Sequence, residues 1–153
     1  MADVYDFIAS YGRDSGIPNL QLNKEGFCSL NFDTVINVDI VFTQEHDQCT
    51  FASNIGDIPA VDQAGFFKEL LKESAFGINT SGACLGIDDE SNKVVMSYTF
   101  ITQSFTYELF KTVLNNFVSL VEEWMGKVKD LSNKHNPSSE STLTSNMLDF
   151  IPA

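Results

Sequence analysis

The residues that could bind a metal or transfer a proton are few and far apart in this chain. Its two histidines, His46 and His135, lie in a charged Glu-His-Asp triplet and in a polar C-terminal stretch. A zinc or iron site needs further His or Cys ligands at short spacing, and none accompanies either histidine. Both segments have the composition of a surface turn or tail, where no packed layer of side chains would hold an imidazole still. We therefore expect two solvated histidines and no metal site.

Patterns for thiol chemistry, calcium binding and phosphate binding are also incomplete. Cys28, Cys49 and Cys84 are odd in number and form no CxxC pair, which predicts reduced thiols that pack as small hydrophobic residues. Residues 88–92 (DDESN) are as acidic as a calcium loop but lack its central glycine and late glutamate. No glycine spacing matches a phosphate loop or a dinucleotide fingerprint. The sequence therefore predicts a binding protein that does no chemistry.

Charge and composition indicate one acidic globular domain. The 153 residues carry a formal net charge of -12, and the pI is near 4.3. Such a surface repels phosphates, so neither nucleic acid nor an anionic membrane is an expected partner. With 43% hydrophobic residues and thirteen phenylalanines, the chain can bury a core. It begins without a basic and apolar leader and has no long apolar stretch, which favours a soluble protein of the cytosol.

Alternation of apolar and polar residues predicts the strands. Five strands are expected, at residues 26–33, 36–43, 48–55, 83–88 and 93–101. The clearest alternation places Ile36, Val38, Ile40 and Phe42 on one face of the second strand. Polar turns separate the first three strands from one another and the last two from each other. We therefore expect an antiparallel meander followed by a hairpin.

Apolar residues at spacings of three and four predict helices at residues 3–11, 61–75 and 106–131. The long stripe of the last helix also suits a coiled coil, but the preceding strands need a cover, so we expect it to pack on the sheet. The order helix, three strands, helix, two strands, helix describes an α+β domain of residues 1–131, with an antiparallel sheet covered by helices. Residues 132–153 are rich in Ser, Asn and Thr and are expected to form a disordered tail.

Taken in order, these elements resemble the class I chaperones of bacterial type III secretion, the Tir-chaperone family. The resemblance covers residues 4 to about 128. Its carriers are Leu20 and Leu22 before Gly26, LNFD at 30–33, IGDIP at 55–59, Leu70 and Leu71, Phe76, GACLGID at 82–88 and Trp124. Two departures are Ser74, where the family commonly has asparagine, and a tail that is longer than in many members. The second departure leaves the role of the tail open.

The resemblance implies a cytoplasmic bacterial homodimer. Such a chaperone wraps the N-terminal part of a cognate effector in extended form and keeps it competent for secretion. The resemblance also implies that the protein catalyses no reaction, needs no cofactor, and has the ATPase of the secretion apparatus as a further partner.

Surplus apolar residues give this role a physical basis. The helix at 61–75 has a wider apolar stripe than one sheet face requires, so a twofold dimer would bury the excess; the alternative is that every one of these residues is core. The residues assigned to the subunit interface are Phe66, Phe67, Leu70, Leu71 and Phe76. An extended effector segment can add to a free sheet edge and contact exposed apolar side chains. The residues assigned to effector binding are Val4, Phe7, Ile8, Tyr11, Phe27 and Val41, with ordinary core or isolated surface positions as the alternative.

Two other classes of function fit the sequence. An acidic inhibitor or adaptor would mask a basic surface of a protein partner, and its binding would collapse as the salt concentration rises. Binding of apolar cargo would persist in high salt. A small enzyme would need two adjacent acids in an apolar cleft, and the twenty-one acidic residues leave that hypothesis open.

Overall fold

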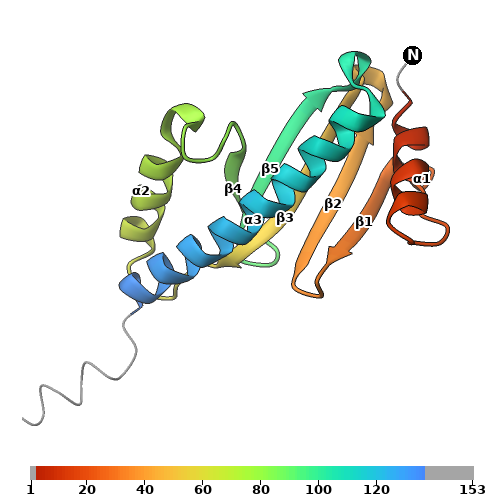
Figure 1. Cartoon of the computed structure of the whole chain (residues 1–153). Coiled ribbons are helices and arrows are strands. Elements are labelled where there is room, and N and C mark those ends of the chain that lie inside the picture. Colours follow the sequence, from red (N-terminus) through yellow and green to blue (C-terminus); the bar gives the residue numbers. More distant parts are fainter. Residues whose placement is uncertain (1–2, 137–153) are drawn as a thin grey trace, which may run out of the picture.

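The computed structural model describes residues 3–136, which form three α-helices and five β-strands joined by loops and short 3₁₀ turns (Figure 1). The strands are β1 (Phe27–Phe32), β2 (Ile36–Thr43), β3 (Gln48–Asp57), β4 (Cys84–Asp88) and β5 (Lys93–Ile101). The helices are α1 (Val4–Asp14), α2 (Gln63–Ser74) and α3 (Tyr107–His135). The predicted α+β class and the predicted order of elements are confirmed.

All five strands form one antiparallel sheet in the order β1-β2-β3-β5-β4. The predicted meander is β1-β2-β3, and the predicted hairpin joins it because β5 pairs with β3. Helix α2 connects β3 to β4, so the chain leaves the sheet at one strand and returns at its far edge. The outer edges of β1 and β4 therefore have no strand partner among residues 3–136.

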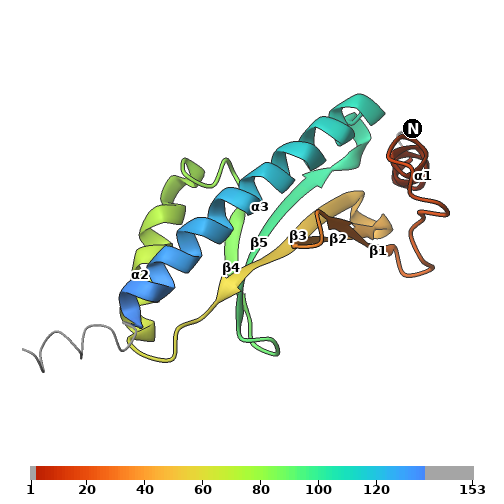
Figure 2. The ribbon, with the colours of Figure 1, turned by 60° about the horizontal axis from the view of Figure 1, so that its bottom comes forward.

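Helix α3 lies across one face of the sheet and supplies much of the core (Figure 2). Its buried stripe consists of Phe110, Leu114, Phe117, Val121, Trp124 and Val128. The ring of Phe110 meets that of Phe51 on β3 edge to face, with 5.6 Å between the centroids. Gly56 allows the helix to come close to β3, because a Cβ at that position would lie 2.4 Å from Val128 Cγ1. The long apolar stripe thus packs on the sheet, as the sequence predicts.

Helix α1 joins the same core beside the first turns of α3. The ring of Phe7 lies 5.5 Å from that of Phe110, measured between centroids. The Tyr107 hydroxyl donates a hydrogen bond to Asp14 Oδ2 at 2.5 Å. Burial and this contact with a carboxylate raise the pKa of Tyr107 to about 12. Helix α1 is therefore attached to α3 by both apolar packing and a hydrogen bond.

Helix α2 packs beside the C-terminal half of α3. Asp62 caps its first turn, where Oδ1 accepts the backbone N–H of Gly65 at 3.2 Å. Phe66 and Leu70 face inward and are buried. Only one narrow stripe of α2 is therefore used within the chain.

Helix α3 extends past the boundary at residue 131 that the sequence predicts. Residues 132–135 are helical, and His135 is held against α2 with its Nδ1 2.7 Å from Asp62 Oδ2. The His135 side chain is only 10% exposed, so the prediction of a solvated histidine in a disordered tail is wrong at this residue. Residues 137–153, the rest of the predicted tail, lie outside the described residues.

Candidate functional site

The sheet face opposite α3 carries exposed apolar side chains. Strand pairing places Phe27 of β1 beside Val41 of β2, and both are more than a third exposed, at 39% and 38%. Ile101 at the end of β5 points to the same face and is also exposed, because its neighbour Phe100 points into the core. Helix α3 lies along the other face (Figure 2). We call Phe27, Val41 and Ile101 the open face.

The outer edge of β1 offers backbone hydrogen-bonding groups next to the open face. Phe27 turns its own backbone groups away from β2, since its N–H donates to Asn23 Oδ1 and its C=O accepts the backbone N–H of Asn23. Alternation along an antiparallel strand gives the backbone groups of Ser29 and Asn31 the same outward direction. No strand in the described part of the chain pairs with them. An extended peptide can therefore add to the sheet at this edge.

Leu71, Phe76 and Ile78 form an exposed apolar knob at the C-terminal end of α2. They are 69%, 96% and 77% exposed. Phe76 has a φ of 63°, a left-handed conformation that costs a residue with a Cβ about 1–2 kcal/mol. The loop behind it is held in place, because Trp124 Nε1 donates to the backbone carbonyl of Asn79 at 3.2 Å. An exposed phenylalanine in a backbone conformation that costs free energy indicates a surface that binds another apolar surface.

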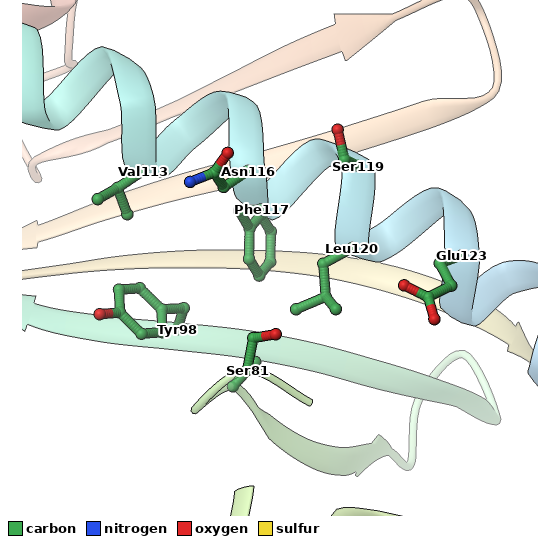
Figure 3. A pocket seen from close by; sticks show the side chains of 9 residues that line it. Ser81, Tyr98, Val113, Asn116, Phe117, Ser119, Leu120 and Glu123 are labelled. Carbon is green, nitrogen blue, oxygen red and sulfur yellow. The ribbon is translucent and has the colours of Figure 1, made fainter. Parts of the chain in front are cut away.

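A cavity of about 410 Å³ opens between α3, β5 and the loop behind the apolar knob (Figure 3). Val113, Phe117 and Leu120 project from α3 into it, and Tyr98 of β5 faces them. Ser81 of the loop forms part of its wall. Polar residues of α3 that also line it are Asn116, Ser119 and Glu123. Polar and apolar side chains line the cavity in similar measure, and it is large enough to accept a side chain from another chain.

Groups with catalytic chemistry lie apart from one another in the described residues, except that His135 contacts Asp62 and Glu69. Within residues 3–136, no three His, Cys, Asp or Glu side chains come together as a metal site requires. Burial raises the pKa of Cys28 to about 11 and that of Cys49 to about 12, so both thiols are unreactive near neutral pH. Cys84 is exposed on β4, which corrects the expectation that all three cysteines are core residues. None of the helices in this part of the chain is both long and apolar enough to cross a membrane.

A model of the Tir chaperone protein (CesT) family matches residues 6–125. The chain belongs to this family. The match spans α1, the whole sheet, α2 and more than half of α3, so the open face, the β1 edge and the apolar knob all lie inside it. The identification made from the sequence is confirmed, and with it the function of a type III secretion chaperone.

Known members share the fold at low sequence identity. The transcriptional anti-antiactivator ExsC of Pseudomonas aeruginosa is 24% identical over 117 residues, which cover 76% of this chain and 79% of ExsC. The crystal structure of the ExsC-ExsE complex aligns with a TM-score of 0.71 and 24% identity, over 80% of this chain and 90% of that one. The HopA1-SchA chaperone-effector complex aligns with a TM-score of 0.62 and 13% identity, over 82% and 91%. These similarities establish the Tir-chaperone fold.

The effector-binding residues assigned from the sequence fall into two groups. Phe27 and Val41 are exposed side by side on the open face. The stripe of α1 is buried in the protomer's own core; it consists of Val4, Phe7, Ile8 and Tyr11. Its assignment as an open binding surface is corrected, because α3 and the sheet already cover it. Sequence reasoning missed Ile101, although alternation along β5 places it opposite the core-facing Phe100.

The subunit-interface residues assigned from the sequence also fall into two groups, one buried and one exposed. Phe66 and Leu70 are core residues of the protomer, and Phe67 is half-buried against that core. For the first two, the alternative that they belong to the intrachain core is the correct one, because α2 buries a single stripe on α3. Leu71 and Phe76 are exposed, as a binding surface requires. Sequence reasoning missed two further exposed residues of this region, Ile78 and Ile87.

Proposed function

We propose that this Tir-chaperone family protein works in the bacterial cytoplasm as a homodimer that holds the N-terminal segment of a secreted effector in extended form. The observation that carries the proposal is the free edge of β1 directly beside the open face. An added strand would gain backbone hydrogen bonds from Ser29 and Asn31, whatever its own sequence. Alternate side chains of the same segment would rest on Phe27 and Val41. Backbone pairing would supply affinity, and the open face would supply selectivity.

The polar surroundings of the open face favour a segment that also carries basic residues. Ser29 Oγ donates to Asp39 Oδ1 at 2.7 Å, and Asn37 Nδ2 donates to the same oxygen at 3.2 Å. These side chains lie beside Phe27 and Val41 on the same face. The carboxylate of Asp39 has further acceptor capacity that a Lys or Arg of the effector would use. This agrees with the net charge of -12 of the whole chain.

The apolar knob supports the homodimer. In a twofold assembly each protomer would present its own Leu71, Phe76 and Ile78 and receive those of its partner. The cavity beside the knob, between α3, β5 and the loop, has Val113, Phe117 and Leu120 on one wall, which such a side chain could contact. Contact with the ATPase of the secretion apparatus stays a prediction that rests on the family resemblance.

A second candidate function is the sequestration of a regulatory protein. It is favoured by the relative ExsC, which is named a transcriptional anti-antiactivator and has a structure in complex with ExsE. The β1 edge and the open face would serve this role with the same chemistry. The two candidates differ in the identity of the bound protein, which capture identifies.

Capture from native cytosol with the full chain as bait tests the proposal. Mass spectrometry of the segment that the chaperone protects from protease should identify the N-terminal part of one secreted protein. Phe27→Asp and Val41→Asp place a charge on the open face and should each abolish capture. Val61→Asp is the matched control, because Val61 is an exposed aliphatic residue outside the open face, just before α2.

Wild-type capture by both open-face variants would show that the segment binds elsewhere. Repeating the capture in about 1 M salt, where charges more than about 3 Å apart are screened, separates the classes of binding. Retention at this salt supports apolar and backbone contacts. Complete loss would favour the acidic adaptor that masks a basic surface.

A further inference from the structure

A cavity of about 500 Å³ lies between the last turns of α3, the end of β3 and the turn that joins β1 to β2. We call it the α3-end cleft. Its apolar lining consists of Val35 in that turn, Ile55 on β3 and Met125 on α3. Val35 is 71% exposed, and Met125 is half-buried. The rim of the cleft therefore leaves apolar side chains accessible within the described part of the chain.

Two lysines make the cleft basic in a strongly acidic protein. Lys93 and Lys129 line it, and the one carboxylate of its lining, that of Asp57, forms a salt bridge with Lys93 at 2.6 Å. Lys129 is exposed and forms no salt bridge with a carboxylate of residues 3–136. The cleft thus carries one positive charge without a local counter-charge, although the net charge of the chain is -12. An apolar segment that carries a carboxylate would suit this lining.

The chain leaves α3 at this cleft. Ser132 and Asn133, in the last turn of α3, belong to the lining, and the described residues end at Asn136. Residues 137–146 are mostly small and polar, and residues 147–151 (MLDFI) are four apolar residues around one acid. A spacer of this length spans up to about 35 Å, and the entropy cost of closing a loop grows only with the logarithm of its length. The apolar segment is therefore within reach of the cleft.

The composition of residues 137–153 is complementary to the cleft. They contain two acids, Glu140 and Asp149, and no Lys or Arg. Successive side chains of an extended segment point to opposite sides, so Met147, Asp149 and Ile151 would share one side. That side has an acid between two apolar residues, which suits a lysine that stands among apolar side chains.

We propose that residues 147–151 bind in the α3-end cleft of their own chain. Asp149 pairs with Lys129. The apolar residues on either side of Asp149 pack against Val35 and Met125. The segment covers the apolar rim of the cleft and fixes the chain that follows α3. This interaction requires neither an effector nor the homodimer.

Attachment to α3 gives the segment a high local concentration. Tethering through a short linker produces an effective concentration of about 1 mM. A segment that alone would bind with a Kd of about 0.1 mM is then docked about ten times as often as it is free. A partly exposed ion pair changes such a ratio by up to about fivefold. Loss of the pair between Asp149 and Lys129 should therefore lower the ratio to about two.

Methionine oxidation by dilute hydrogen peroxide tests the docking, because the cleft contains Met125 and the segment contains Met147. Mass spectrometry of the full chain gives the initial rate at each site, and a synthetic peptide of residues 141–153 gives the rate without a cleft. Met147 should be oxidised about tenfold more slowly in the chain than in the peptide. In Lys129→Glu this difference should fall to about twofold, and Met125 should be oxidised faster than in the wild-type chain.

Charge reversal on the segment provides the second variant. Asp149→Lys should release the segment as Lys129→Glu does. The two substitutions together should restore the wild-type rates, because the pair forms again with opposite signs. Lys68→Glu is the matched control and should keep the wild-type rates. Lys68 is an exposed lysine of α2 outside the cleft, and it too forms no salt bridge within the described residues.

Oxidation of Met147 at the peptide rate in the wild-type chain would overturn the proposal. Slow oxidation that persists in Lys129→Glu would also overturn it, because the segment would then bind another surface. The same conclusion would follow from release in Lys68→Glu or from a double variant that stays released. Rates that rise on dilution would show that a second copy supplies the segment, which contradicts binding within one chain. A failure of the proposed effector site or homodimer changes none of these outcomes.

Discussion

Replacing Phe76 by asparagine separates the conformational cost of the apolar knob from its use in binding. Phe76 is almost wholly exposed and has a φ of 63°. Asparagine adopts this left-handed conformation with less strain than an aromatic residue does, and the protomer buries almost nothing of the side chain that is removed. We expect Phe76→Asn to leave the free energy of unfolding of the protomer unchanged, or to raise it by up to about 1 kcal/mol.

The same substitution should weaken self-association strongly. Full burial of one phenylalanine side chain contributes about 1.5–3 kcal/mol, and a twofold interface contains two copies. Their loss amounts to about 3–6 kcal/mol, or a rise in the dimer Kd of about 10²- to 10⁴-fold. Sedimentation velocity over a dilution series measures this constant, and chemical denaturation of the dilute protomer measures its stability.

Val35→Asn is the matched control for this experiment. Val35 is a strongly exposed aliphatic residue in the turn between β1 and β2, outside the apolar knob, so its loss should leave the dimer Kd unchanged. A wild-type Kd for Phe76→Asn would refute the interface. A protomer destabilised by more than about 1 kcal/mol would refute the strain argument, because it would show that Phe76 packs within its own chain.

Two further predictions concern the protomer itself. Gly56→Ala should lower the free energy of unfolding, measured in urea, by about 1–3 kcal/mol, because the new Cβ would meet Val128 Cγ1 at 2.4 Å. Adding Val128→Ala should recover part of this loss, and a double mutant without such a coupling energy would contradict the contact. Gly86→Ala is the control, since no atom lies within 4 Å of its Cβ position. In the native protein at mildly alkaline pH, a thiol reagent should label the exposed Cys84 rapidly. Cys28 and Cys49 should stay unmodified until the chain unfolds, because both are buried and their pKa values are about 11 and 12. Rapid labelling of all three thiols would contradict the burial of Cys28 and Cys49.

The three helices and the strands β1, β2, β3 and β5 were predictable because each has one buried face, whereas β4 has no buried residue. The alternation from Ile36 to Phe42 and the stripe from Tyr107 to Leu131 encode that face directly. The C-terminal end of α3 was not predictable in this way. His135 is held by Asp62, which is 73 positions away in the chain, and no local pattern of residues reveals such a contact.

Site residues were harder to assign because amphipathicity shows that a face is buried without showing what covers it. The stripe of α1, with Phe7 at its centre, is covered by the protomer itself. The same holds for Phe66 on α2. Phe27 and Val41 could be found because alternation placed them opposite a strand face that was already known to be core. The exposure of Phe76 follows from its backbone conformation, which composition and periodicity do not report.

The two exposed surfaces lie towards opposite edges of the sheet, and this arrangement determines how they can work together. The β1 edge carries the proposed effector site, while the apolar knob lies beyond β4 at the end of α2 (Figure 1). A dimer formed through the apolar knobs would therefore leave both β1 edges free and place them on the outside of the assembly. One extended effector segment could then pair with both edges in turn. The second pairing would be intramolecular, so the dimer would bind the effector segment more tightly than either β1 edge does alone, although each edge buries no additional surface.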